Sequence, residues 1–390
     1  MNSTSPKSIW PVLERVAVLI LSLLLLWIGL KTSRYTPTDA VQEECETATV
    51  LEVMDTYEEA ATEGATPTTY VIFRAKMTSG EQKGEVLEMQ QSIEPMILPK
   101  PDPVQPGDRI LVLDAYQMGL TTDYQWIFGG QNRIPGMIWL TAAFLALVIL
   151  IGRWKGVATV ISLLITFAAL FGLYIPSILM GRNIYWTTIV ISLYVILSSL
   201  ALLNGLNGKT LCAVIGNFGG IVVAGLLALI VNHALKITGM LDTEYTFLTM
   251  LSSDVSIDLR AVVWGGILIG SLGAIMDVSM SITSAMYELS FEVNRKNIKR
   301  MITAGMNIGR DAIGTMTNTL ILAYIGGSLA LVLLFTAYNR NPLMMLNFEM
   351  IVVEVVQAVV GSIGILFAVP ITVLIAAWLF QKNMSEENAE

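Results

Sequence analysis

Long apolar runs recur along this chain, and short polar segments separate them. A helix that crosses a bilayer needs about 17–25 predominantly apolar residues. Eight runs approach or exceed this length with few charges, and they cover residues 16–30, 137–151, 157–180, 185–203, 211–235, 261–282, 313–338 and 350–380. The sequence therefore predicts a membrane α-helical bundle of eight transmembrane helices.

The first and last runs set the outer boundaries of this bundle. We expect residues 1–31 to form a cytoplasmic tail and an uncleaved anchor helix, because no small-x-small cleavage site follows the first run. Residues 134–380 then form a seven-helix membrane domain, and residues 381–390 form a tail. The run 350–380 exceeds the length that a bilayer requires, and Pro370 within it predicts a kink.

Residues 32–133 differ from the rest of the chain in pattern and in charge. Apolar and polar residues alternate over 47–54, 69–76, 85–89 and 109–113, which predicts four short strands. Four strands in so short a stretch favour a small SH3- or OB-like β-barrel. The segment holds 17 acidic and 7 basic residues, a local balance of −10, and no histidine. We expect a folded acidic module without catalytic chemistry.

The charges between the runs predict the orientation. Cytoplasmic loops of membrane proteins are enriched in lysine and arginine. Eleven such residues fall in the segments that alternation places inside, and four in the short loops that it places outside. Both termini are therefore predicted to be cytoplasmic, the β-rich domain extracytoplasmic, and the protein a multi-pass component of a bacterial cytoplasmic membrane.

Composition and missing motifs narrow the function classes. Apolar residues make up 54% of the chain and charged residues 14%, whereas charged residues make up about 25% of a soluble domain. This composition excludes a soluble enzyme, and no basic face indicates nucleic-acid binding. The sequence has no HExxH, GxSxG or metal-spaced histidine and cysteine set. We therefore expect no enzymatic activity, no cofactor and no metal site.

Polar residues within the apolar runs are the candidate functional residues. A charge at mid-bilayer costs about 2.5–3.5 kcal/mol on insertion scales, so such residues are functional candidates. Two stripes follow helical spacing. The first comprises Asp277, Ser281, Ser284 and Glu288, and the second comprises Asn307, Asp311, Thr315 and Asn318.

We expect these two stripes to face each other in the cytoplasmic half of adjacent helices. Arg310 then pairs with Asp277 or Asp311, and the stripes line a polar vestibule for a small solute, an ion or a proton relay. The competing interpretation is a buried structural network, or an interfacial segment at headgroup level where Arg310 and Asp311 cost little.

The segment 287–300 connects the two helices and is amphipathic and basic. Such a segment lies on the anionic inner leaflet of the lipid bilayer, or it docks on a separate cytoplasmic ATPase. The chain itself has no GxxxxGK[ST] loop, so any nucleotide energy has to come from such a partner.

Weaker signals lie elsewhere in the apolar runs. His233 ends the fifth run, and Glu354 and Gln357 lie close together in the last one. Pairs of glycines four residues apart permit close helix packing. These pairs are Gly216 with Gly220, Gly266 with Gly270, and Gly305 with Gly309.

Two segments carry a resemblance to a known family. They are GSLGAIMDVSMSI at 270–282 and GMNIGRDAIGTMTNTLILAY at 305–324. With the N-terminal anchor and the β-rich domain, the sequence resembles the YibE/F family of bacterial multi-pass membrane proteins over nearly its whole length. The resemblance implies a cytoplasmic membrane location and transport on general grounds, and it assigns no substrate.

The leading prediction is a permease or transporter-like component. Its solute or ion pathway is predicted to comprise Asp277, Ser281, Asn307, Arg310, Asp311, Thr315 and Asn318. The alternative is a non-transporting membrane sensor or assembly scaffold, which binds a partner through the extracytoplasmic domain.

Overall fold

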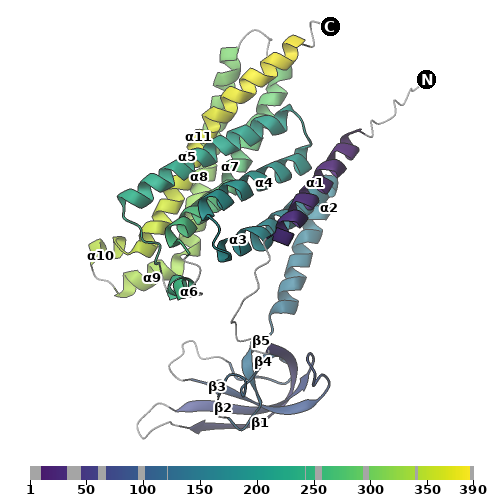
Figure 1. The fold of residues 1–390 in the computed structure, drawn as a ribbon, viewed down its shortest axis with the longest axis vertical. Coiled ribbons are helices and arrows are strands. Elements are labelled where there is room, and N and C mark those ends of the chain that lie inside the picture. Colours follow the sequence, from purple (N-terminus) through teal and green to yellow (C-terminus); the bar gives the residue numbers. More distant parts are fainter. Residues whose placement is uncertain are drawn as a thin grey trace, which may run out of the picture. The chain divides into compact units, whose positions relative to one another are not determined.

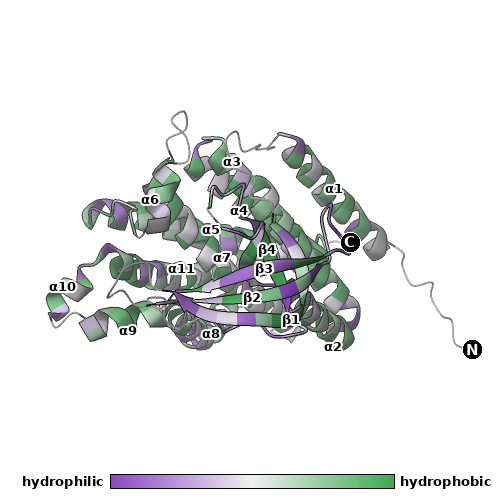
Figure 2. Ribbon diagram, turned by 90° about the horizontal axis from the view of Figure 1, so that it is seen from below, coloured by the Kyte–Doolittle hydropathy of each residue, from purple (hydrophilic) through white to green (hydrophobic). Residues whose placement is uncertain are grey.

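The computed structural model describes residues 10–32, 45–59, 67–94, 102–120, 122–241, 243–250, 257–292, 298–338 and 341–386 (Figure 1). The chain divides into two compact units. One combines Met1–Thr36 with Val148–Glu390, and the other is Pro37–Leu147. In Figure 2 the helices are predominantly hydrophobic, whereas hydrophilic residues are frequent on the strands.

The smaller unit contains a closed five-stranded barrel with the strand order β1-β2-β3-β5-β4. Neighbouring strands are antiparallel except β3 and β5, which are parallel. Phe73, Met89, Ile110 and Trp126 lie in its core, each at most 4% exposed. The strands are β1 (Cys45–Glu59), β2 (Thr68–Met77), β3 (Val86–Ile93), β4 (Arg109–Asp114) and β5 (Trp126–Gln131).

The prediction of a small barrel is confirmed, but the prediction of four strands is wrong. The fifth strand, β5, carries Gly129 and Gly130 and lacks the alternation that marks the others. It forms by long-range pairing with β4 and β3, which the local pattern does not report.

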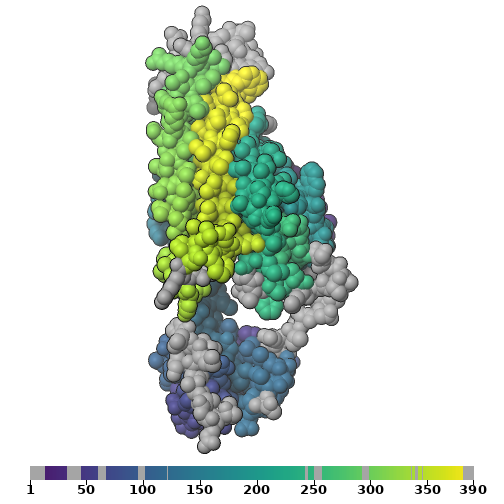
Figure 3. Space-filling model, turned by 90° about the vertical axis from the view of Figure 1, so that its left-hand side faces the viewer, coloured from purple at the N-terminus to yellow at the C-terminus, as the bar shows by residue number. Residues whose placement is uncertain are grey.

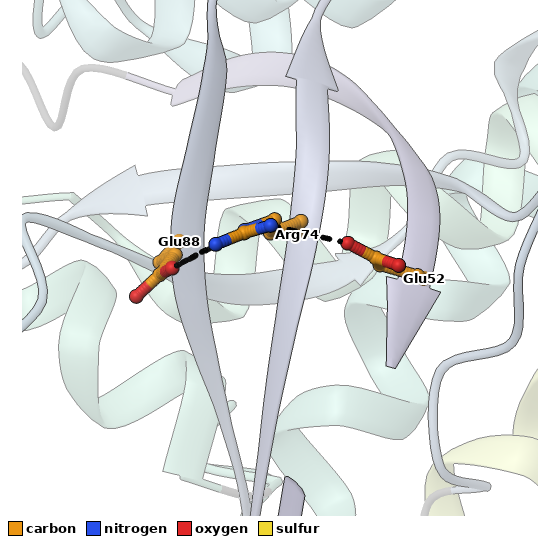
Figure 4. A network of polar contacts seen from close by, with 3 residues as sticks. All are labelled: Glu52, Arg74 and Glu88. Atoms are coloured by element: carbon orange, nitrogen blue, oxygen red, sulfur yellow. Dashed lines mark hydrogen bonds and ion pairs between the residues drawn. The ribbon is translucent and has the colours of Figure 1, made fainter. Parts of the chain in front are cut away.

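A row of charges crosses the outer surface of the barrel. Arg74 on β2 lies between Glu52 on β1 and Glu88 on β3, with N···O distances of 3.3 and 2.9 Å (Figure 4). The hydrogen bond to Glu88 is the largest of the effects that raise the pKa of Arg74. The side chains are exposed, so solvent screens these pairs and they contribute little to stability.

The larger unit is helical. Asn side chains cap two of its helices, since Asn183 accepts from the Trp186 amide at 3.1 Å and Asn207 from the Thr210 amide at 2.9 Å. The helices of the chain are α1 (Trp10–Thr32), α2 (Ile134–Ala169), α3 (Ile175–Leu179), α4 (Ile184–Asn204), α5 (Gly208–Ala234), α6 (Thr243–Met250), α7 (Leu259–Glu292), α8 (Ile298–Gly327), α9 (Leu329–Tyr338), α10 (Pro342–Leu346) and α11 (Glu349–Glu386). A π-helical turn, Leu170–Tyr174, joins α2 to α3, and α2 begins in the smaller unit.

Six of the described helical segments are long and apolar enough to cross a membrane. The count is seven if α8 and α9, which meet at 61°, form one broken span. The chain is thus a multi-pass membrane protein. The two predicted runs 137–151 and 157–180 fall in one segment of 46 residues, Ile134–Leu179.

That long segment contains a sharp turn. Arg153 has φ 52° and ψ −129°, outside the helical region. A methyl group on Gly156 would clash with the carbonyl oxygen of Val148, eight residues earlier. Residues eight apart in a straight helix are separated by about 12 Å along the axis, so the chain reverses at Arg153.

Three long helices, α5, α7 and α11, pack closely at the centre of the helical unit (Figure 1). A methyl group on Gly220 of α5 would lie 2.9 Å from the carbonyl oxygen of Gly364 on α11 and 2.9 Å from Ile275 on α7. The predicted packing role of the Gly216 and Gly220 pair is confirmed. The α11 helix continues through Pro370 without an interruption of its secondary structure.

Candidate functional site

Contacts at the centre of the bundle fix the depth of each candidate residue. Gly220 is near the midpoint of α5, and its neighbours are Ile275 on α7 and Ala368 on α11. Asp277 follows Ile275 by two residues, which is about 3 Å along the helix axis. Asp277 therefore lies at the middle depth of the bundle rather than at a helix end.

Asp277 is exposed, and it lines a groove between α2, α4 and α7. The groove has a volume of about 400 Å³. Hydroxyl groups from the two other helices line it together with apolar side chains. The hydroxyl residues are Thr159, Ser162 and Thr166 on α2, and Ser192 and Ser199 on α4.

Two of the three hydroxyls on α2 have already donated their protons within their own helix. Thr159 donates its proton to the Lys155 carbonyl at 2.9 Å, and Thr166 donates to the Ser162 carbonyl at 3.0 Å. A hydroxyl oxygen that has used its proton in this way remains an acceptor. Among the described residues, the Asp277 carboxylate has no hydrogen-bond or ion-pair partner. The groove thus combines one carboxylate with two threonine acceptor oxygens among apolar side chains, and these oxygen groups suit a proton or a small cation.

The second stripe, on α8, does not share this groove. The expectation that the two stripes face each other is wrong. On α8, Gly305 packs against Met286 of α7 and Val373 of α11, and Gly309 packs against Ile282 and Val369. The polar residues lie on the opposite side of α8 and are exposed. They are Asn307, Arg310, Asp311, Thr315 and Asn318.

The partners of the charged residues on α8 also differ from the prediction. Arg310 donates a hydrogen bond to the side-chain oxygen of Asn307 at 3.2 Å, and none of the ion pairs found among the described residues joins it to Asp277 or Asp311. Thr315 donates to the Ala312 carbonyl of its own helix at 3.1 Å. On α7, Ser281 is exposed one turn beyond Asp277.

The α8 stripe also lies at middle depth. The contacts of Gly305 with Val373 and of Gly309 with Val369 show that α8 runs antiparallel to α11. Val369 adjoins Ala368, which is the neighbour of Gly220 at the midpoint of α5. Asp311 is therefore near the centre of the bundle in depth. A charged side chain at the middle of a bilayer raises the free energy of insertion by about 2.5–3.5 kcal/mol unless a polar neighbour covers it.

A third set of polar residues, which the sequence reasoning missed, is buried between the three central helices. Asn217, Ser279 and Thr372 are each 0% exposed, and their side-chain polar atoms lack hydrogen-bond partners. Thr372 contacts Gly216, so the three residues occupy nearly one level of the bundle. Asn217 within an apolar run was the sequence signal for this set. It was missed because no charged residue lies near it in the run.

The remaining candidates lie apart from this central region or pair locally. His233 is exposed at the end of α5. Glu288, at the far end of the α7 stripe, forms an ion pair with Lys209 at 3.3 Å. Residues 293–297 of the predicted amphipathic segment lie outside the described residues. The described residues contain no group of three histidine, cysteine or acidic side chains placed to hold a metal ion.

Comparison with known proteins relates the helical part of the chain to a protein family. The sequence signature of the family described as YibE/F-like protein matches residues 140–382, which include the groove, the α8 stripe and the buried polar level. No curated protein matches the chain, and no solved structure does. The match covers more than half of the sequence and includes both segments that carry the resemblance, and on this basis the chain belongs to the YibE/F-like family.

Proposed function

We propose that this chain is a membrane permease in which the groove around Asp277 binds and passes a proton or a small cation. One observation carries the proposal: an exposed carboxylate without a partner among the described residues lies at the middle depth of the bundle, where it lines a groove of apolar and hydroxyl side chains. Ionisable residues at this depth are rare and are typical of ion pathways and proton relays. Central placement between helices is also typical of transporter sites.

The chemistry of the lining favours cations over anions. Thr159 and Thr166 have committed their protons to their own helix, so their oxygens carry negative partial charge toward the groove. Together with the Asp277 carboxylate they compensate the lost hydration of a cation. Among the described residues that line the groove there is no arginine or lysine to attract an anion.

The proposal includes an orientation in a bacterial cytoplasmic membrane. Dividing the run Ile134–Leu179 at the Arg153 turn and counting α8 with α9 gives eight crossings, an even number that leaves both termini on one side. Arg15 and Trp154 line a common groove, so the turn lies at the N-terminal end of α1. The basic residues there favour the cytoplasmic side, which makes the barrel extracytoplasmic.

The function is tested by ion flux through the purified full chain in liposomes. An outward potassium gradient with valinomycin drives protons inward, and an enclosed pH dye reports their entry. We expect the wild type to dissipate the gradient and Asp277→Asn to fall to the rate of protein-free liposomes. Glu288→Gln is the matched control, because it removes a carboxylate from an exposed end of the same helix.

A sodium or potassium gradient without valinomycin, with the corresponding cation dye, extends the test to small cations. If Asp277→Asn conducts protons, sodium and potassium as the wild type does, or if the wild type conducts none of them, the proposal is refuted.

A specific surface of the barrel favours the alternative of a sensor or scaffold. Leu51, Val53, Met54 and Tyr57 on β1 are each at least 39% exposed. Exposed apolar residues of this kind are common at protein-binding surfaces. Under this alternative, changing all four residues to serine releases a bound protein partner. Neither the wild type nor this variant then conducts ions.

A further inference from the structure

The exposed polar face of α8 is the strongest unexplained feature of the structure. Among the described helices, α8 is the most strongly amphipathic. Figure 3 shows α8 (light green) lying along α11 (yellow), with no other described segment in front of it on this face. The side chains of Asn307, Arg310, Asp311, Thr315 and Asn318 are exposed within the described part of one chain, although they lie at the middle depth of the bundle.

The residues on this face follow a heptad spacing. Successive members are three or four residues apart, which is the spacing of a seam along which two helices pack in a left-handed pair. We define the α8 seam as Ala304, Asn307, Asp311, Gly314, Asn318, Ile321 and Ile325.

The seam is open and small enough for close approach. Asn307, Asp311, Gly314 and Asn318 are exposed, and Ile325 is 52% exposed. A methyl group on Gly314 would meet no atom within 4 Å, so the glycine is not needed for packing inside the chain. Small residues and amides on a membrane helix permit close helix contact and hydrogen bonds across it.

The charges on this face are complementary to themselves. Arg310 immediately precedes the seam residue Asp311. In a parallel pair of helices, each seam residue packs between residues of the other helix. One of these is the residue next to the same seam position in that helix. Asp311 of each copy thus lies beside Arg310 of the second copy, and the pairing occurs twice around a two-fold axis.

We propose that a second copy of this chain covers the α8 seam, and that the two copies pair in parallel through Asn307, Asp311, Gly314 and Asn318. The pairing neutralises Arg310 and Asp311 at middle depth and gives the Asn318 side chain a partner. It concerns a face of α8 that is separate from the Asp277 groove, so it does not rest on the proposed function. A monomeric protein would refute the pairing and leave the flux test unaffected.

Disulfide cross-linking between differently tagged copies tests the contact directly. Single cysteines are introduced into a Cys45→Ser, Cys212→Ala background, and membranes holding both tagged copies are oxidised. Gly314→Cys is expected to cross-link, and it fits without strain because its surroundings are open. Leu226→Cys on α5 is the matched control, since it is 57% exposed at a similar depth. Equal cross-linking at both positions, or none at Gly314→Cys and none at Asn318→Cys, overturns the proposal.

A charge exchange tests the complementarity in the full chain. Subunit counting by single-molecule photobleaching in dilute liposomes gives the monomer–dimer dissociation constant. Arg310→Asp is expected to raise this constant about tenfold, because the new carboxylate of each copy then lies beside Asp311 of the other copy, and this repulsion occurs twice in the pair. The double variant Arg310→Asp with Asp311→Arg is expected to restore it to near the wild-type value. Monomeric wild-type protein, or a double variant as weak as the single one, contradicts the pairing.

Discussion

Close packing at Gly220 makes the strongest stability prediction for the helical unit. Changing Gly220 to alanine adds one methyl group, which would lie 2.8 Å from the Ala368 Cβ and 2.9 Å from both the Gly364 carbonyl oxygen and the Ile275 Cγ2. Non-bonded contacts are optimal at about 3.5–4.0 Å, so α5 has to move away by roughly 0.5–1 Å. Two of the three neighbours belong to the backbone or Cβ of α11 and cannot turn aside. Overpacking of this kind costs about 1–3 kcal/mol.

The matched control is Gly273→Ala on α7, where a methyl group meets no atom within 4 Å. Both variants exchange a helical glycine for alanine, so the difference between them removes the effect of helix propensity. The assay is the melting midpoint of the detergent-solubilised full chain, followed by size-exclusion chromatography after heating. We expect Gly220→Ala to melt clearly below Gly273→Ala. Equal midpoints would show that α5 and α11 are not packed as described.

Further predictions concern the barrel and a buried hydrogen bond. Phe73→Ala empties a core position that is 0% exposed and should lower the free energy of unfolding of the barrel by about 3–5 kcal/mol. Arg74→Met on the outer face should change this free energy little. Limited proteolysis of the barrel during heating compares the two variants. Similar protection of the two variants would place Phe73 outside the core. Trp264→Phe removes the donor to the Gly225 carbonyl at 2.9 Å and should cost about 1 kcal/mol, measured by the same melting assay as for Gly220. A melting midpoint unchanged from the wild type would argue against that bond.

The helical unit has two separate polar surfaces at middle depth. The Asp277 groove lies on the side of α7 that faces α2 and α4, and the α8 seam lies on the far side of α8 from α7. One vestibule between the two helices was the simplest arrangement from the sequence, and the structure replaces it with two separate surfaces. The separation allows a groove variant and a seam variant to be tested independently.

The sequence by itself determined the membrane class, the small barrel and the helical positions of the polar residues. Apolar runs and their lengths reflect the hydrocarbon thickness, and the spacing of Asn307, Asp311, Thr315 and Asn318 fixes one helix face. Both properties are local, so a single chain reveals them. The strand β5 was missed because its register depends on partners far along the sequence.

Only the tertiary structure decided which neighbour each polar face meets. Gly305 and Gly309 bring α8 closest to α7 and α11, and this contact turns the polar face of α8 away from Asp277. Helix periodicity places residues on a common face but leaves the rotation of that face about the helix axis free. Close approach at small residues fixes the rotation, because the backbones pack most tightly where no side chain separates them.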